Sequence, residues 1–436
     1  MWRASLHAGS IGGVTAIRLL LIAFLALTNV AVAAPERCAC DSSRAASEGA
    51  ANETFEPPGR WVASPLSDKM MARHLPADVE SVAGITGSLG SQQGRAFYGG
   101  QRLLSALNPE ISLTGDFAGW ARVPQFPADS IPEVYGPGWG DRFYLREAEF
   151  HIVAPLDPYT RGKFFFGISG EGHFHLGEAY MEWVSLPGNL NLKVGKYRNQ
   201  FGVLNRWHEH ALPQVDRPLV FTSFLGEEGL SGMGISASWL LPRLWAHVNE
   251  LTLEMISGGD GVSFAEEGGR DRVAVGRLKN YWDLSANAYL EVGLSGALGH
   301  NDPEGKLSTR LGGVDLTYKW VPADRALYRT FELRSEWLWS WRQTEQGRIK
   351  SWGGYVSVQN RFGARWWGGV RLDYSHLPVS AAETLKSGSV VLTYWQSEFV
   401  FLRLQLQRTL CTYGSDITKG ILQIVWSMGP HKHEAY

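Results

Sequence analysis

Cysteine and charge are scarce in this chain, and long apolar runs are scarcer. Three cysteines among 436 residues cannot build a disulfide framework. Charged residues make up 19% of the chain and nearly cancel, to a formal net charge of −2. Such a balance does not predict the basic patch or stripe by which proteins bind nucleic acid. Beyond residue 34 no run approaches the roughly 18 apolar residues of a transmembrane helix, so helical spans are not expected.

Glycine and aromatic residues are abundant instead. The chain has 50 glycines, 18 tryptophans, 15 tyrosines and 19 phenylalanines. A large aromatic content combined with low charge argues against a disordered protein. These aromatics are expected either in the core of a soluble β-protein or in the interfacial girdles of a membrane barrel.

The first 34 residues have the pattern of a secretory signal peptide. Arg3 and Arg18 precede the apolar run 19–27, and small residues at 31–33 offer a cleavage site. Residues 35–106 show no sustained period of either kind, and we expect a short periplasmic segment that is flexible or partly ordered.

Residues 107–436 show the alternation of apolar and polar residues that is typical of β-strands. In the segment 399–408, for example, Leu402, Leu404 and Leu406 alternate with Arg403 and Gln405. About sixteen such segments can be placed between residues 109 and 428, most of them long enough to cross a bilayer when tilted. The connections between successive segments alternate between short and long, and one of the long connections is expected over residues 377–384. The pattern predicts an all-β fold, a transmembrane antiparallel β-barrel of about 16 strands.

The face opposite the lipid is expected to line a water-filled lumen. It carries charges of both signs, so the sequence does not predict an ion preference. The acidic residues on this face include Glu254, Glu336 and Asp373. The candidate pore residues on these strands are Glu147, Glu149, Glu178, Glu182, Lys193, Arg277 and Lys279.

The longest connection, 199–227, follows the fifth strand. Its mixture of aromatic, acidic and basic residues is unusual for a flexible external loop, and folded inward it would narrow the pore. An outward cap or an oligomer contact is the alternative. The candidate constriction residues are Arg206, His208, His210, Asp216 and Arg217.

Three His-x-His pairs occur, at 173/175, 208/210 and 431/433. Two histidines at positions i and i+2 of a strand share a face and could bind Zn²⁺ through both imidazoles. His208 and His210 are therefore candidate metal ligands, with Glu178, Glu209 or Asp216 available to complete the site. The alternative is that these are ordinary polar residues. No other cofactor is expected.

Several segments resemble a known group of proteins. LNPEISLTGDF at 107–117, the stretch 177–202, and HEHALPQVDRP with FLGEEGLSG after it are similar to the phosphate-selective porin O/P superfamily. Some relatives are labelled zinc-regulated TonB-dependent outer-membrane receptors. The resemblance implies a sixteen-stranded porin-like barrel. Neither a lysine ladder nor an arginine cluster marks a phosphate site, and the chain is too short for 22 strands and a plug.

These observations predict a porin in the cell outer membrane that passes small hydrophilic solutes or ions. Its partners would be outer-membrane lipid and those solutes, with no nucleic acid, and a homotrimer would suit a general porin. A metal-binding or zinc-uptake protein is the alternative, and a closed structural barrel is a third. An enzyme is not expected, because no nucleophile elbow G-x-S-x-G occurs.

Overall fold

The computed structural model describes residues 109–123, 143–266 and 271–429. The predicted signal peptide and periplasmic segment lie outside these ranges. Among the residues described, no helix has both the length and the apolar character needed to span a membrane.

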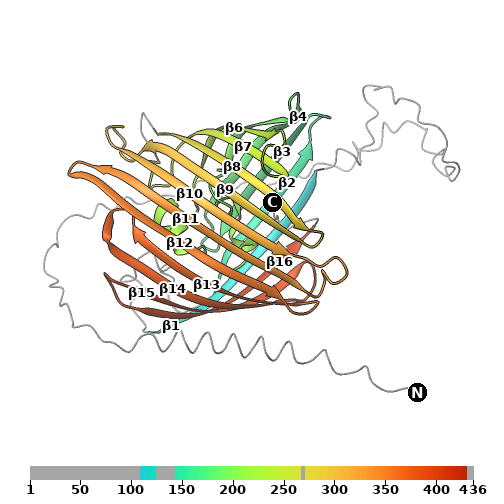
Figure 1. Ribbon diagram of the computed structural model, residues 1–436. Helices are drawn as coiled ribbons and strands as arrows, with labels where there is room; N and C mark the ends of the chain where they lie inside the picture. The colour runs from blue at the N-terminus through green and yellow to red at the C-terminus, as the bar shows by residue number, and fades with distance from the viewer. Residues whose placement is uncertain (1–108, 124–142, 267–270, 430–436) are drawn as a thin grey trace, which may run out of the picture. The chain divides into compact units, whose positions relative to one another are not determined.

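Sixteen antiparallel strands form one closed barrel, in which each strand pairs with its neighbours in the chain and β1 pairs with β16 (Figure 1). The predicted all-β barrel of sixteen strands is confirmed. The strands are β1 (Glu110–Val123), β2 (Phe143–Pro155), β3 (Thr160–Ser169), β4 (Phe174–Leu186), β5 (Leu190–Arg198), β6 (Ser231–Leu241), β7 (Val248–Ser257), β8 (Arg272–Ser285), β9 (Ala288–His300), β10 (Ser308–Trp320), β11 (Thr330–Thr344), β12 (Gly347–Arg361), β13 (Trp366–Leu377), β14 (Ser380–Trp395), β15 (Val400–Cys411) and β16 (Ile417–Met428).

The two faces of the strands differ as the alternation requires. Leu253 on β7 and Leu294 on β9 are 56% and 50% exposed on the outer face, whereas Glu254, the next residue after Leu253, is buried inside. Because side chains of a strand alternate between faces, one pattern supplies both a lipid-facing surface and a polar interior. Closure of the barrel leaves no strand edge with unpaired backbone groups in lipid.

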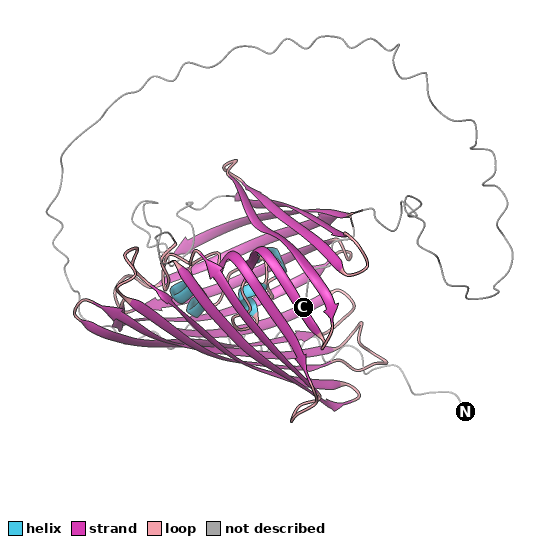
Figure 2. Ribbon diagram, turned by 90° about the horizontal axis from the view of Figure 1, so that it is seen from above, coloured by secondary structure: helices cyan, strands magenta, loops and turns pink. Residues whose placement is uncertain are grey.

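The connection between β5 and β6 folds into the barrel. This segment, residues 199–230, is called the inward loop below; it contains η3 (Leu204–Arg206), η4 (Glu209–Ala211) and α3 (Leu219–Leu225). Figure 2 shows its helices enclosed by the strands. The prediction that this connection folds inward is confirmed.

Apolar side chains of the inward loop pack on one side of the barrel wall. Phe201, Phe221 and Phe224 are fully buried there, against small and apolar inward-facing residues of β7 to β12. The wall residues of this core are Ile256, Val273, Val275, Ala297, Leu311, Leu338 and Tyr355. The loop is therefore a packed part of the fold, with a hydrophobic core inside the barrel.

The prediction of a long connection over residues 377–384 was wrong. Only residues 378–379 separate β13 from β14, and the pairing shifts register between His376 and Leu377. This irregularity interrupts the alternation at the strand end, where the sequence was interpreted as a loop.

The orientation of the strands yields a first prediction. Leu253→Arg places a charge in the middle of β7 on the lipid-facing surface, which costs about 2–4 kcal/mol near the bilayer midplane. We expect a large loss of folded barrel, measured as the heat-modifiable band on gels of outer-membrane fractions. Ser238→Arg is the matched control, because Ser238 faces a polar cavity inside the barrel. Equal folded yields of the two variants would contradict the assignment of faces.

Candidate functional site

The inward loop is held by hydrogen bonds from its backbone to side chains of the wall. Glu336 on β11 accepts from the backbone N–H groups of Val203 and Leu204, at 2.7 and 3.2 Å. The Tyr355 hydroxyl donates to the same carboxylate at 2.7 Å. Buried backbone N–H groups need such acceptors, and the short helices of the loop leave several of them unpaired by other backbone groups.

The same arrangement recurs at two other places along the loop. Glu254 on β7 accepts from the side-chain amide of Asn199 and the backbone N–H of Gln200, both at 2.8 Å. Asp373 on β13 accepts from the backbone N–H of Leu219 at 3.1 Å. These acidic residues were expected to face water in an open lumen; they are buried instead, because the loop occupies that space.

Asp216 connects the inward loop to β13, β15 and β16 of the wall. Its carboxylate accepts hydrogen bonds from Arg371 at 3.1 Å and Gln405 at 2.6 Å, and lies 3.6 Å from the Lys419 ammonium. Burial would raise the pKa of Asp216, but the cationic side chains of Arg371 and Lys419 outweigh it and lower that pKa.

Arg217 closes the loop on itself. Its guanidinium donates to the carbonyl oxygens of Leu204 at 2.9 Å and Trp207 at 2.6 Å, and the residue is 3% exposed. A buried guanidinium held by carbonyl oxygens fixes the turn between η3 and α3.

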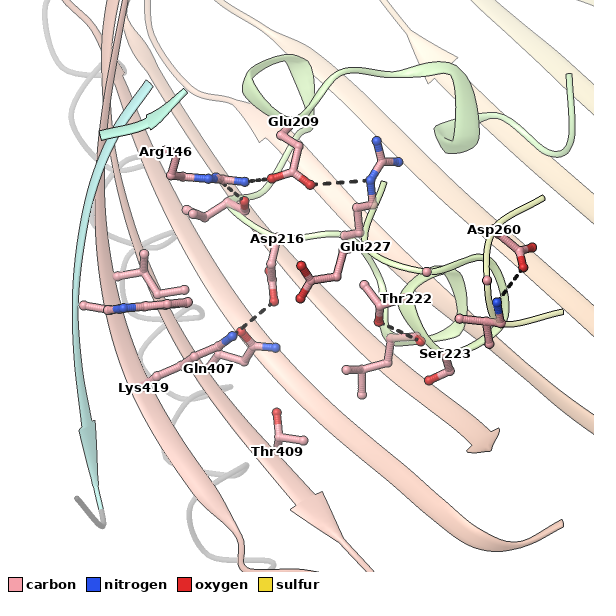
Figure 3. A pocket seen from close by; sticks show the side chains of 18 of the residues that line it. Arg146, Glu209, Asp216, Thr222, Ser223, Glu227, Asp260, Gln407, Thr409 and Lys419 are labelled. Atoms are coloured by element: carbon pink, nitrogen blue, oxygen red, sulfur yellow. Dashed lines mark hydrogen bonds and ion pairs between the residues drawn. The ribbon is translucent and has the colours of Figure 1, made fainter. Parts of the chain in front are cut away.

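The space that the loop leaves at one end of the lumen is acidic. Cavity 1 is about 640 Å³ and reaches the β7–β8 and β13–β14 connections. Figure 3 shows Arg146 of the wall against Glu209 of the loop. Burial raises the pKa of Asp260, on the β7–β8 connection, to about 6. Among the described residues that line cavity 1, six are acidic and three basic: Asp116, Glu147, Glu209, Asp216, Glu227, Asp260, Arg146, Arg217 and Lys419.

The space at the other end is basic. Cavity 2 is about 510 Å³ and lies where short turns join β2 to β3, β4 to β5 and β6 to β7. Several of its charges are paired across strands, such as Lys163 with Glu178 at 2.8 Å and Arg161 with Glu182 at 2.7 Å. The charged residues described in its lining are Arg161, Lys163, Lys193, Arg198, Arg206, Lys279, Glu178, Glu182 and Glu250, six basic and three acidic.

The predicted pore residues divide into three groups. Glu147, Asp216 and Arg217 line cavity 1. Arg206, Glu178, Glu182, Lys193 and Lys279 line cavity 2. Four residues line neither cavity: Glu149, His208, His210 and Arg277. Arg277 is buried in the wall with its guanidinium 2.8 Å from Asp315.

The two candidate metal ligands of the loop point to different partners. His208 Nε2 lies 3.3 Å from Glu178, and burial lowers the pKa of His208 to about 3. His210 Nδ1 lies 2.5 Å from Glu149. The assumption that the pair shares one face of a strand was wrong, because η4 begins at Glu209.

Two residues at this site were missed by the sequence analysis. Arg146 follows Leu145 where β2 bulges against β1, and the register shift brings Arg146 to the inside against the simple alternation. His151 lies two residues beyond Glu149 on the same face of β2, so this alternation was a readable signal. The remaining predicted histidine pair at 431/433 lies outside the described residues.

The anchoring of the loop yields a second prediction. Glu336→Ala removes the acceptor of two buried backbone N–H groups and one hydroxyl, and each group left without a partner costs about 1–3 kcal/mol. We expect a lower unfolding midpoint in guanidinium and faster hydrogen exchange at residues 203–204. Asp324→Ala removes an exposed carboxylate from the β10–β11 connection and serves as the control. Unchanged exchange in the Glu336 variant would contradict the anchoring role.

Comparison with known proteins supports the fold. No family model matches the chain. A relative from Aquifex aeolicus (strain VF5), named "Uncharacterized protein", is 29% identical over 74% of this chain and 77% of its own. This chain is 11% identical to each of two solved structures, an anion-selective porin from Comamonas acidovorans and OprB from Pseudomonas putida. Their TM-scores are 0.51 and 0.52, over 74% and 75% of this chain and 100% and 95% of theirs.

Identity this low establishes a shared fold and nothing about the solute. The closed sixteen-stranded barrel and its apolar outer face are those of a transmembrane β-barrel. The chain is an outer-membrane β-barrel with the porin fold.

Proposed function

We propose that this protein is a passive channel for small hydrophilic solutes or ions, with the inward loop as its constriction. The observation that carries the proposal is that the inward loop lies inside the barrel (Figure 2), with a cavity lined by charged side chains toward each end. Passage by diffusion needs no covalent chemistry, so we propose a non-enzymatic role. Outer-membrane lipid and the solutes are the proposed partners, and a homotrimer fits a barrel of this kind.

Fixed charge is the proposed source of selectivity. Among the described residues, acidic side chains predominate in cavity 1 and basic side chains in cavity 2. Rings or clusters of charged side chains select ions by favouring entry of the opposite charge. A permeating ion of either sign is therefore attracted in one cavity and opposed in the other.

The resemblance of segments 107–117 and 177–202 supports a distant relation to the phosphate-selective porin superfamily, which we propose at the level of architecture. Zinc uptake, the alternative from the sequence, gains no support from the comparisons and is not proposed as the function.

A shortened loop tests the constriction directly. Replacing residues 203–226 by a short Gly-Ser linker removes the material that fills the lumen, and we expect a several-fold larger single-channel conductance in planar bilayers. Shortening the β9–β10 connection, residues 301–307, is the control, because that connection lines neither cavity. Equal conductance of the folded loop variant and the wild type would show that the loop does not restrict the permeation path.

A charge reversal tests the selectivity. Arg206 of the loop lines cavity 2, and Arg206→Glu lowers the positive excess there. We expect the reversal potential in a KCl gradient to shift toward cation preference, because the electrostatic barrier to cations falls. Arg348→Glu makes the same change at an exposed position in β12 beside the β11–β12 turn. Identical shifts in both variants would mean that cavity 2 does not set selectivity.

A further inference from the structure

Three potential metal ligands converge where the inward loop meets β2. Glu149 and His151 point inward from β2, and His210 comes from η4 of the loop. Glu149 Oε2 lies 2.5 Å from His210 Nδ1 and 3.5 Å from His151 Nε2, and all three ligand atoms fit within 4.8 Å of one another. The three residues are 2–6% exposed.

These distances suit a small divalent cation. Zn²⁺ binds imidazole nitrogen and carboxylate oxygen at about 2.0–2.2 Å, which places tetrahedral ligand atoms roughly 3.3 Å apart. The distance from Glu149 Oε2 to His151 Nε2 is already close to this value. The distance from Glu149 Oε2 to His210 Nδ1 would have to increase by about 0.8 Å. Two histidines and one carboxylate form a donor set that zinc accepts, with a fourth position for water.

The surroundings of the cluster are partly apolar. The Phe165 ring packs edge-on against His151, with centroids 4.5 Å apart, and also contacts His208. An apolar neighbour of this kind orients the imidazole and limits access of bulk water. His208 remains with Glu178, so the cluster differs from the His208/His210 pair expected from the sequence.

We propose that Glu149, His151 and His210 bind a divalent cation of the Zn²⁺ type, and that the ion clamps the inward loop to β2. Two of the ligands belong to the wall and one to the loop, so the ion bridges the two directly. The clamp goes beyond the proposed channel function, because passive permeation does not require a metal.

Binding is tested on the folded, chelator-treated full-length barrel in detergent. We expect one Zn²⁺ per barrel in calorimetric titration, and d–d absorption of Co²⁺ in the intensity range of tetrahedral nitrogen and oxygen ligation. Glu149→Gln, His151→Asn and His210→Asn should each weaken binding by at least the ten- to hundredfold that changes around a metal site cost. Absence of Zn²⁺ binding by the folded wild type would overturn the proposal.

A second His–Glu pair in the same barrel provides the matched control. His175 Nε2 lies 2.6 Å from Glu147, on β4 and β2, outside the cluster. His175→Asn should leave Zn²⁺ affinity unchanged; a loss equal to that of His151→Asn would show that the ion binds elsewhere. Far-UV circular dichroism identifies the variants that fold, and any one folded cluster variant with undiminished affinity overturns the assignment.

Hydrogen exchange tests the clamp separately. Zn²⁺ should slow amide exchange over residues 206–212 in the wild type and have no effect in His210→Asn. Zn²⁺ binding without slower amide exchange would support the metal site but contradict its role as a clamp on the inward loop. Neither readout depends on conductance, so failure here leaves the channel proposal standing, and a closed channel that binds Zn²⁺ contradicts the channel alone.

Discussion

A loop inside a barrel can exist only if its backbone hydrogen-bonding groups find partners there. The inward loop has two very short 3₁₀ helices and one α-helix of seven residues, so most of its N–H groups lack partners within the helices themselves. The wall supplies the acceptors at fixed positions, with Glu336, Glu254 and Asp373 as the main ones. Buried acidic side chains are costly without such hydrogen bonds, so the loop and the carboxylates stabilise each other.

The inward loop makes two kinds of contact with the inner wall of the barrel. Toward β7 to β12 the loop forms a hydrophobic core with apolar residues, among which Glu254 and Glu336 accept hydrogen bonds from it. Elsewhere it meets charged and amide side chains, as where Asp216 contacts Arg371 and Gln405. Apolar packing holds the loop against the wall but is not directional. Hydrogen bonds are directional, so those to individual wall carboxylates fix the position of the loop along the wall. The open space inside the described part of the barrel includes two cavities with defined linings, one toward each end of the lumen.

The sequence predicted the features that repeat and missed those that occur once. Alternation over sixteen segments determined strand number and orientation, because every residue of a strand adds to the same signal. Arg146 was missed because one extra residue at a bulge reverses the alternation locally. The β13–β14 turn was missed because residues 381–383 have no partner in the pairing, which interrupts the alternation. The loop N–H groups that bind Glu336 are 132 and 133 residues away from it in the chain, and no local pattern contains such a pairing. For the same reason the lumen was predicted as water-filled: charges on a strand look alike whether they face water or a loop.

The near-neutral composition conceals a separation of charge. Counted over the described linings, the acidic excess of cavity 1 equals the basic excess of cavity 2, so the two cancel in the net charge of the chain. A solute between the cavities experiences the nearer charges far more strongly than the sum, because salt screens charges beyond about 10 Å. In the proposed channel, ion preference would therefore depend on which charged residues line the constriction formed by the inward loop. Net charge carries no information about it, and neither does a count of lumen charges, because the loop determines which of those charges a solute can reach.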